Sequence, residues 1–127
     1  MILENIHCLL QFDDRGNLLA LVSKSSGRNY IVKDGCSLFR LTMTEIIENR
    51  VMPGTLALTG DMAEQIDFIQ QSQCVEIDYR NLDGMPVTVK CTIGFMDEEI
   101  HWNILIENKT RFAVSEIEYP VLLFKPY

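Results

Sequence analysis

The fold class is indicated most clearly by residues 74–95, which read CVEIDYRNLDGMPVTVKCTIGF. On each side of the central Asn-Leu-Asp-Gly turn, apolar and polar side chains alternate, and a period of two places successive side chains on opposite faces of a strand. The Asp-Gly pair supplies the positive φ that a tight connection needs. We therefore expect a hairpin that pairs residues 74–80 with residues 87–95, with one buried face and one solvated face.

The two faces of this hairpin differ in chemistry. On the first arm, the face expected in the core holds Val75, Ile77 and Tyr79. The face expected in water holds Glu76, Asp78 and Arg80. On the second arm, the apolar register comprises Val87, Val89, Cys91, Ile93 and Phe95. A thiol in such a register behaves as a small hydrophobe, so we expect Cys91 to be buried.

The same alternation, interrupted by frequent turns, recurs along the chain and predicts many short antiparallel strands. One hairpin is expected from residues 6–12 and 18–22, joined by a turn in which Gly16 can take positive φ. Asp34-Gly35 marks the end of a later segment. Further strands are expected at residues 37–47, 100–107 and 114–123. Pro120 has no amide donor, so the last of these strands should lie at a sheet edge or end there.

Residues 49–71 form the least regular part of the chain, with a turn at Pro53-Gly54. Within it, residues 63–71 are compatible with one or two helical turns or with a strand over residues 65–70, and we favour the strand. No linker or internal repeat divides the chain. The sequence therefore predicts an all-β, antiparallel β-sandwich that forms a single domain of 127 residues.

Composition limits the classes of function. The length suits one domain with a core of its own. The chain has 18 acidic and 11 basic residues, a net charge of -7, and its basic residues are scattered. Because phosphate binding depends on clustered Lys and Arg, we expect no nucleic-acid partner. No apolar run approaches the roughly 18 residues that a membrane span needs, so we expect no membrane partner either.

Residues 1–7 contain no basic region, sustained apolar run or small-residue cleavage site, which favours a cytoplasmic location. The alternative is a chain whose leader has been removed, and Asn108-Lys109-Thr110 would then be a glycosylation acceptor. The four cysteines are Cys8, Cys36, Cys74 and Cys91. None has the close spacing of a zinc or redox site, so we expect four reduced thiols, no metal ligands and no cofactor.

Several segments, read in order, resemble one family. Residues 13–30, DDRGNLLALVSKSSGRNY, are similar to the opening strands of galactose-mutarotase-like supersandwich domains. Residues 37–41, SLFRL, are similar to the strand that follows in such domains. Residues 102–110, WNILIENKT, and residues 113–122, AVSEIEYPVL, are similar to two of their later strands. The resemblance covers most of the chain.

The resemblance carries expectations about function. Such domains usually stand at the N-terminus of large glycoside hydrolases, ahead of a (β/α)-barrel that holds the catalytic carboxylates. This chain is shorter than such a supersandwich usually is, so the resemblance implies a truncated or excised N-terminal piece. It also implies a non-catalytic domain that packs on, or orients, a barrel absent from this chain.

No catalytic residue can be named from the sequence. Glycoside hydrolysis needs two carboxyl groups on either side of the scissile bond. The pairs Glu76 with Asp78, and Glu116 with Glu118, share strand faces, but solvated faces explain them. The acidic residues 97–99 are most simply a charged turn. The histidines are His7 and His101. Mutarotase chemistry needs a histidine and a carboxylate that converge, and neither histidine lies in a segment that matches the family's catalytic motifs, so surface or packing roles are expected.

A carbohydrate site would stack a sugar on aromatic rings. The rings that we weigh for this role are Tyr30, Tyr79, Phe95, Trp102 and Tyr119. Trp102 shares its register with Ile100, Ile104 and Ile106, which indicates a core residue. The rings expected to be exposed are Phe112 and Tyr127. No carbohydrate-binding residue can therefore be assigned.

Three functions remain open at this point. The first is the non-catalytic domain that the resemblance implies, with a catalytic barrel as its partner. The second is a stand-alone module that binds a carbohydrate or another protein. The third, which the missing catalytic motif and the short length disfavour, is a small epimerase-like enzyme. Self-association is also expected, because the apolar run 121–124 would leave the terminal strand 114–123 uncovered.

Overall fold

The computed structural model describes residues 1–32 and 37–124. The first strands are β1 (Ile2–Glu4), β2 (Cys8–Phe12) and β3 (Leu18–Ser23). The middle of the chain supplies β4 (Arg40–Ile47), β5 (Arg50–Val51), β6 (Leu56–Thr59) and one 3-10 turn, η1 (Gly60–Met62). The remaining strands are β7 (Ala63–Gln70), β8 (Cys74–Leu82), β9 (Val87–Met96), β10 (Glu99–Asn108) and β11 (Phe112–Glu118). Strands make up 62% of the described residues and the sheets are antiparallel, so the predicted all-β, sandwich-like class is confirmed.

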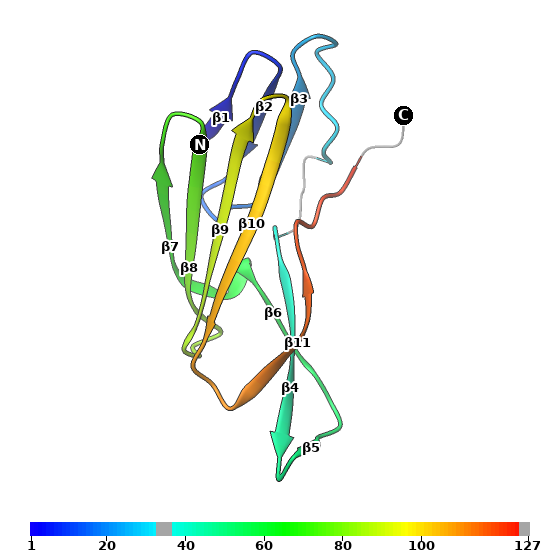
Figure 1. Ribbon diagram of the computed structural model, residues 1–127, viewed down its shortest axis with the longest axis vertical. Coiled ribbons are helices and arrows are strands. Elements are labelled where there is room, and N and C mark those ends of the chain that lie inside the picture. Colours follow the sequence, from blue (N-terminus) through cyan, green and yellow to red (C-terminus); the bar gives the residue numbers. More distant parts are fainter. Residues whose placement is uncertain (33–36, 125–127) are drawn as a thin grey trace.

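The strands form three antiparallel sheets. The first has the order β1-β2-β3, and the second has the order β10-β9-β8-β7. The third is centred on β4, which pairs with β11 on one side and with β6 and β5 on the other. Figure 1 shows β7–β10 side by side along the molecule, β1–β3 next to their upper part, and the β4–β5 hairpin extending below. Within residues 1–32 and 37–124, no helix is long and apolar enough to cross a membrane.

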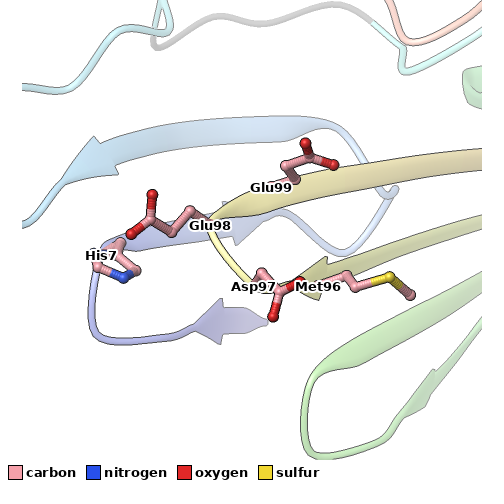
Figure 2. Close-up of a pocket in the computed structure, with 5 residues that line it drawn as sticks. All are labelled: His7, Met96, Asp97, Glu98 and Glu99. Carbon is pink, nitrogen blue, oxygen red and sulfur yellow. The ribbon is translucent and has the colours of Figure 1, made fainter.

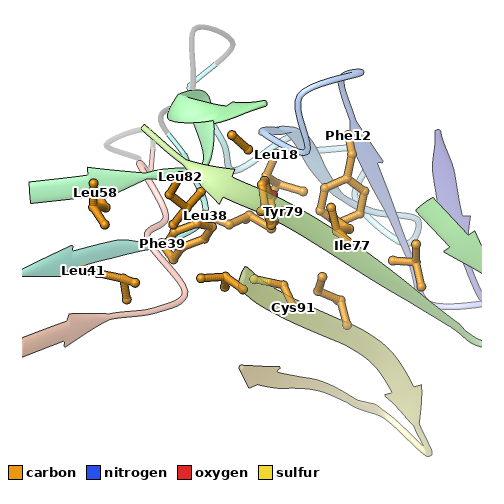
Figure 3. Close-up of a cluster of buried hydrophobic side chains, with 14 of the residues drawn as sticks. Phe12, Leu18, Leu38, Phe39, Leu41, Leu58, Ile77, Tyr79, Leu82 and Cys91 are labelled. Carbon is orange, nitrogen blue, oxygen red and sulfur yellow. The ribbon is translucent and has the colours of Figure 1, made fainter. Parts of the chain in front are cut away.

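One hydrophobic core joins the three sheets (Figure 3). The inner residues of β8 and β9 are fully buried: Val75, Ile77, Tyr79, Val87, Val89, Cys91 and Ile93. The other sheets and their connections contribute further buried side chains, among them Leu10, Phe12, Leu38, Phe39, Leu41 and Leu58. Because each fully buried apolar side chain of this size contributes about 1.5–3 kcal/mol, this shared core holds the sheets together.

Tyr79 is the point at which the core is most tightly constrained. Its hydroxyl donates a hydrogen bond of 3.2 Å to the carbonyl of Gly16, in the β2–β3 turn. Its ring meets the ring of Phe39 edge-on, with 4.9 Å between centroids. A Cβ atom at Gly60 would lie 2.6 Å from Tyr79 Cε1. The side chain therefore fits only because both turns that touch it carry glycine.

The β2–β3 turn is fixed by polar contacts as well. One carboxylate oxygen of Asp13 accepts hydrogen bonds of 2.9 Å from the N–H groups of Arg15 and Asn17. The guanidinium of Arg15 donates to the carbonyls of Asp61, at 2.8 Å, and Ala63, at 3.0 Å. The turn of the first sheet is thus bound to η1 and to the start of β7. Gly16 takes a φ of 76°, which confirms the predicted role of this glycine.

Several strand predictions are confirmed. The hairpin over residues 74–95 forms as β8 and β9, with positive φ at both Asp83 and Gly84. The strand favoured within residues 63–71 forms as β7. The terminal strand is an edge strand and ends before Pro120, at Glu118.

Two predicted boundaries are wrong. The strand expected from residue 37 begins at Arg40, because Leu38 and Phe39 both enter the core and consecutive buried residues break the alternation of a strand. Residues 121–123 are not strand, although the Val121 N–H donates to the Leu38 carbonyl at 2.7 Å. The turn expected at Asp34-Gly35 lies outside the described residues.

The prediction of a solvated charged face on β8 is wrong for Asp78. The residue is on the outer face, as expected, but only 3% of its surface is exposed. Its cross-strand neighbours are Asp67 on β7 and Lys90 on β9, and Nη2 of Arg80 lies 3.6 Å from its carboxylate. Because β8 is a central strand, neighbouring side chains on both sides stand about 5 Å away and cover this short residue.

Candidate functional site

A hollow of about 600 Å³ on the described surface lies where the β9–β10 turn approaches the β1–β2 connection. Figure 2 shows its lining, which consists of His7, Met96, Asp97, Glu98 and Glu99. Because it brings a histidine and several carboxylates together, it is the candidate site on chemical grounds.

Local backbone structure positions both halves of this hollow. In the β1–β2 connection, the side-chain oxygen of Asn5 accepts hydrogen bonds from the N–H groups of His7, at 2.8 Å, and Cys8, at 2.9 Å. In the other half, β9 and β10 are joined by a two-residue turn in which Asp97 has a φ of 56°. Positive φ is the conformation that tight hairpin turns require, and Asp tolerates it better than most residues.

The second histidine, His101, lies near the start of β10, two residues after Glu99. Nε2 of His101 lies 3.1 Å from a carboxylate oxygen of Glu99. His101 is half-buried, whereas His7 and residues 96–99 are exposed. The structure therefore brings both histidines to the same end of the molecule, which the sequence did not indicate. The expected charged turn at residues 97–99 is confirmed.

The chemistry open to this hollow is limited by its exposure. Active sites usually exclude water from the reacting groups, whereas these side chains stand in solvent. Burial raises the pKa of the neighbouring Cys8 thiol, against the opposing effect of the Lys24 charge. A raised pKa makes a thiol less nucleophilic at neutral pH. In the part of the chain that the structure describes, no three His, Cys, Asp or Glu side chains are arranged to hold a metal ion.

The other carboxyl pairs weighed from the sequence do not converge on a hollow. Glu76 and Asp78 lie on the outer face of β8, where Asp78 is covered by its neighbours. Glu116 and Glu118 are exposed on β11. Glu118 lines a small hollow of about 240 Å³ together with Asp61 and Arg40, and Glu116 is not part of it. These positions supply single carboxylates rather than an opposed pair.

The aromatic rings are mostly used in packing. Tyr79 is fully buried, and Phe95, Trp102 and Tyr119 are half-buried against the core. Trp102 meets Tyr119 edge-on, with 6.3 Å between ring centroids, so the predicted packing role of Trp102 is confirmed in its contacts. The remaining rings considered earlier are Tyr30 and Phe112, which are half-buried, and Tyr127, which lies outside the described residues.

The described cysteines are free thiols, and Cys36 lies outside the described residues. Burial raises the pKa of Cys91 to about 12. Cys91 is fully buried, as its register predicted. A thiol with such a pKa stays protonated at neutral pH and has a packing role rather than a chemical one.

The surface that the sequence did not predict is the outer half of the β4–β5 hairpin, residues 46–51, which we call the finger. Ile46 pairs with Val51, and among the described residues neither has a partner strand outside the hairpin itself. Ile46 and Ile47 are each 46% exposed, and Val51 is 71% exposed. The finger therefore carries apolar side chains into solvent on both of its faces.

The finger is a well-formed element. Glu48 and Asn49 have φ values of 52° and 62°, the pattern of a type I′ turn. At its base, the Met52 N–H donates to the Glu45 carbonyl at 2.8 Å, and Arg111 forms an ion pair of 3.3 Å with the Glu45 side chain.

Comparison with family models and with curated proteins gave no match for this chain.

Proposed function

We propose that this chain is a non-catalytic β-sandwich domain that packs against a catalytic domain and orients it, and that the finger is its contact. The observation that carries the proposal is the exposure of Ile46, Ile47 and Val51 on a projecting hairpin. An isolated two-stranded ribbon is marginally stable in water, and exposed apolar residues on it gain when a partner covers them.

The resemblance to the N-terminal domains of glycoside hydrolases supports the choice of partner. Those domains precede a barrel that carries the catalytic carboxylates, and the two carboxyl pairs weighed from the sequence, Glu76 with Asp78 and Glu116 with Glu118, do not line a hollow together. The histidine and carboxylates around the hollow also favour a role without chemistry, because they stand in solvent rather than in a site closed to water.

A carbohydrate-binding role is less well supported than packing. Sugar recognition uses exposed aromatic faces. Of the aromatic residues in the described part of the chain, only Phe124 has more than half of its surface exposed, at 58%. A single ring does not provide a platform, whereas the finger provides three adjacent apolar side chains.

The first experiment measures chemistry. The isolated chain should not hydrolyse aryl glycosides, and it should not accelerate the mutarotation of glucose followed by polarimetry. A rate above buffer that persists through purification, and is lost when one carboxylate is replaced by its amide, would contradict a non-catalytic role.

The second experiment measures packing in the protein made from the complete reading frame. If the frame encodes a barrel, amide hydrogen exchange at residues 46–51 should be slower there than in the isolated chain. Ile46→Lys with Val51→Lys should abolish this protection. Ile69→Lys is the matched control, because Ile69 is equally exposed, at 48%, on the outer face of β7.

Equal exchange in both proteins would refute the finger as the contact. A reading frame that encodes no second domain would refute the barrel as the partner and would favour the stand-alone binding module.

A further inference from the structure

The outer edge of β10 is an unpaired sheet edge among the described residues, and it is separate from the finger. β10 is the last strand of its sheet and pairs only with β9 among the described residues. With residues 99–108 it is as long as any strand in the structure. Residues 100–106 contain no Asp, Glu, Lys or Arg. A long edge strand without charges presents free backbone donors and acceptors to another chain.

The register shows which backbone groups are free. Glu99 faces Met96 across a two-residue turn, and the Lys109 N–H donates to the Pro86 carbonyl at 3.0 Å. In an antiparallel pair, residues that exchange hydrogen bonds alternate with residues that do not. The odd-numbered residues of β10 therefore bond to β9. The even-numbered residues direct their N–H and C=O groups outward, and these are Ile100, Trp102, Ile104 and Ile106.

The same four residues carry the inner side chains of β10, and all four are only half-buried. The inner residues of β8 and β9, by contrast, are almost all without exposed surface. A strand added to β10 would therefore satisfy the free backbone groups and cover the exposed parts of these side chains at the same time.

The edge of β11, where the sequence predicted self-association, is protected instead. Its pairing with β4 shifts between Val114 and Glu116, as in a β-bulge. Exposed Glu116 and Glu118 follow, and Pro120 comes after the end of the strand. Bulges, charges and proline are the devices that keep an edge strand from pairing. The free edge suited to pairing is that of β10.

We propose that a second copy of this chain pairs with β10, antiparallel, about a two-fold axis at Ile104. When β10 pairs antiparallel with a second copy of itself, inner residues lie opposite inner residues only if the two-fold axis passes at a residue rather than between two residues. Two such registers, with the axis at Asn103 or at Ile104, keep most of β10 paired. With the axis at Asn103, Glu99 would oppose Glu107 twice.

With the axis at Ile104, the two copies are complementary. Glu99 opposes the partner's Lys109, and His101 opposes the partner's Glu107. On the inner face Trp102 opposes the partner's Ile106. Opposite charges and aromatic-aliphatic pairs stabilise antiparallel strands, and like charges directly opposite destabilise them. Charge therefore selects the Ile104 register and favours a second copy as the occupant, joining two four-stranded sheets into one.

A charge exchange tests the dimer and its register together. Glu99→Lys would set two lysines opposite each other at both ends of the paired strands, and Lys109→Glu would set two glutamates there. Each variant should therefore raise the dimer dissociation constant at least tenfold. An equimolar mixture of the two variants restores opposite charges at both ends and should dimerise as the native chain does. Light scattering and sedimentation velocity at about 100 μM measure all four samples.

Glu116→Lys is the matched control, with the same charge change on β11, and it should leave the dimer intact. A native chain that stays monomeric would overturn the proposal. A tighter dimer of Glu99→Lys would place the axis at Asn103 and overturn the register. Loss of the dimer in Glu116→Lys or Leu123→Lys, with Lys109→Glu unaffected, would place the contact on the terminal segment and overturn the β10 edge.

Discussion

Replacing Gly16 by alanine tests whether the contact between the β2–β3 turn and Tyr79 holds the sandwich together. The new Cβ atom would lie 2.2 Å from the Tyr79 hydroxyl oxygen and 2.9 Å from Cζ. Tyr79 has little room to withdraw, because Phe39 and Gly60 bound its ring. We expect the substitution to force the ring and the turn apart.

The expected loss in the free energy of unfolding of Gly16→Ala has three parts. Alanine at the left-handed φ of 76° costs about 1–2 kcal/mol. Forcing an extra carbon into a packed core costs about 1–3 kcal/mol. A buried hydrogen-bonding group left without its partner costs about 1–3 kcal/mol, if the bond from Tyr79 to the Gly16 carbonyl is lost. The sum is about 3–8 kcal/mol, a large share of the roughly 5–15 kcal/mol by which domains are stable.

Gly27→Ala is the matched control, since Gly27 has a φ of 71° but no atom within 4 Å of the added Cβ. It should cost about 1–2 kcal/mol, the backbone part alone. Urea unfolding followed by the fluorescence of Trp102, the single tryptophan, measures both variants. Equal costs for Gly16→Ala and Gly27→Ala would refute the account of the contact.

The double variant Gly16→Ala with Tyr79→Phe separates the steric clash with Tyr79 from the backbone cost of alanine in the turn. Tyr79→Phe alone should cost about 1–3 kcal/mol, because the buried Gly16 carbonyl loses its donor. In the Gly16→Ala background the same change removes the nearest of the clashing atoms, the hydroxyl oxygen, so it should cost less or stabilise the protein. A coupling free energy of at least about 1 kcal/mol is expected, and additivity would contradict the contact.

The buried thiol and phenols give two further predictions. Burial raises the pKa of Cys91 to about 12 and also raises the pKa values of Tyr79 and Tyr119. Above about pH 8.5 the unfolded chain loses the thiol proton and the folded chain keeps it, so the free energy of unfolding should fall by about 1.4 kcal/mol per pH unit. Urea titrations from pH 8 to pH 10 check this, and Cys91→Ala should remove most of the slope, the rest coming from Cys8 and the two tyrosines; an unchanged slope would contradict it. With Ellman's reagent the denatured, non-reduced chain should show four thiols, and Cys91 should react only on unfolding; rapid reaction in the native state would contradict its burial.

The hairpins were predictable because local sequence determines them. Alternation over residues 74–95 and an Asp-Gly turn define β8 and β9 without reference to the rest of the molecule. The start of β4 was not predictable in this way, because Leu38 and Phe39 are placed by a core that three sheets build together. Asp78 was mispredicted for the same reason, since its burial depends on Asp67, Lys90 and Arg80.

The surface features needed the structure as well. His7 and His101 are far apart in the sequence, and only the approach of two turns places them at one end. The apolar residues of the finger, Ile46, Ile47 and Val51, would by composition suit a core. Their exposure follows from the pairing of Ile46 and Ile47 with β5 alone, which no periodicity indicates. The protected edge of β11 and the open edge of β10 likewise follow from the order of the strands.

The fit of Tyr79 between two glycines also bears on how this sequence can change over evolution. A Cβ atom at residue 60 would meet both the Tyr79 ring and Ser37 Oγ, and one at residue 16 would meet the Tyr79 hydroxyl. Substitution at any of the three positions is therefore conditional on the others. Among relatives, larger residues at 16 or 60 should accompany a smaller or hydroxyl-free residue at 79, so three sites distant in sequence should co-vary as a unit.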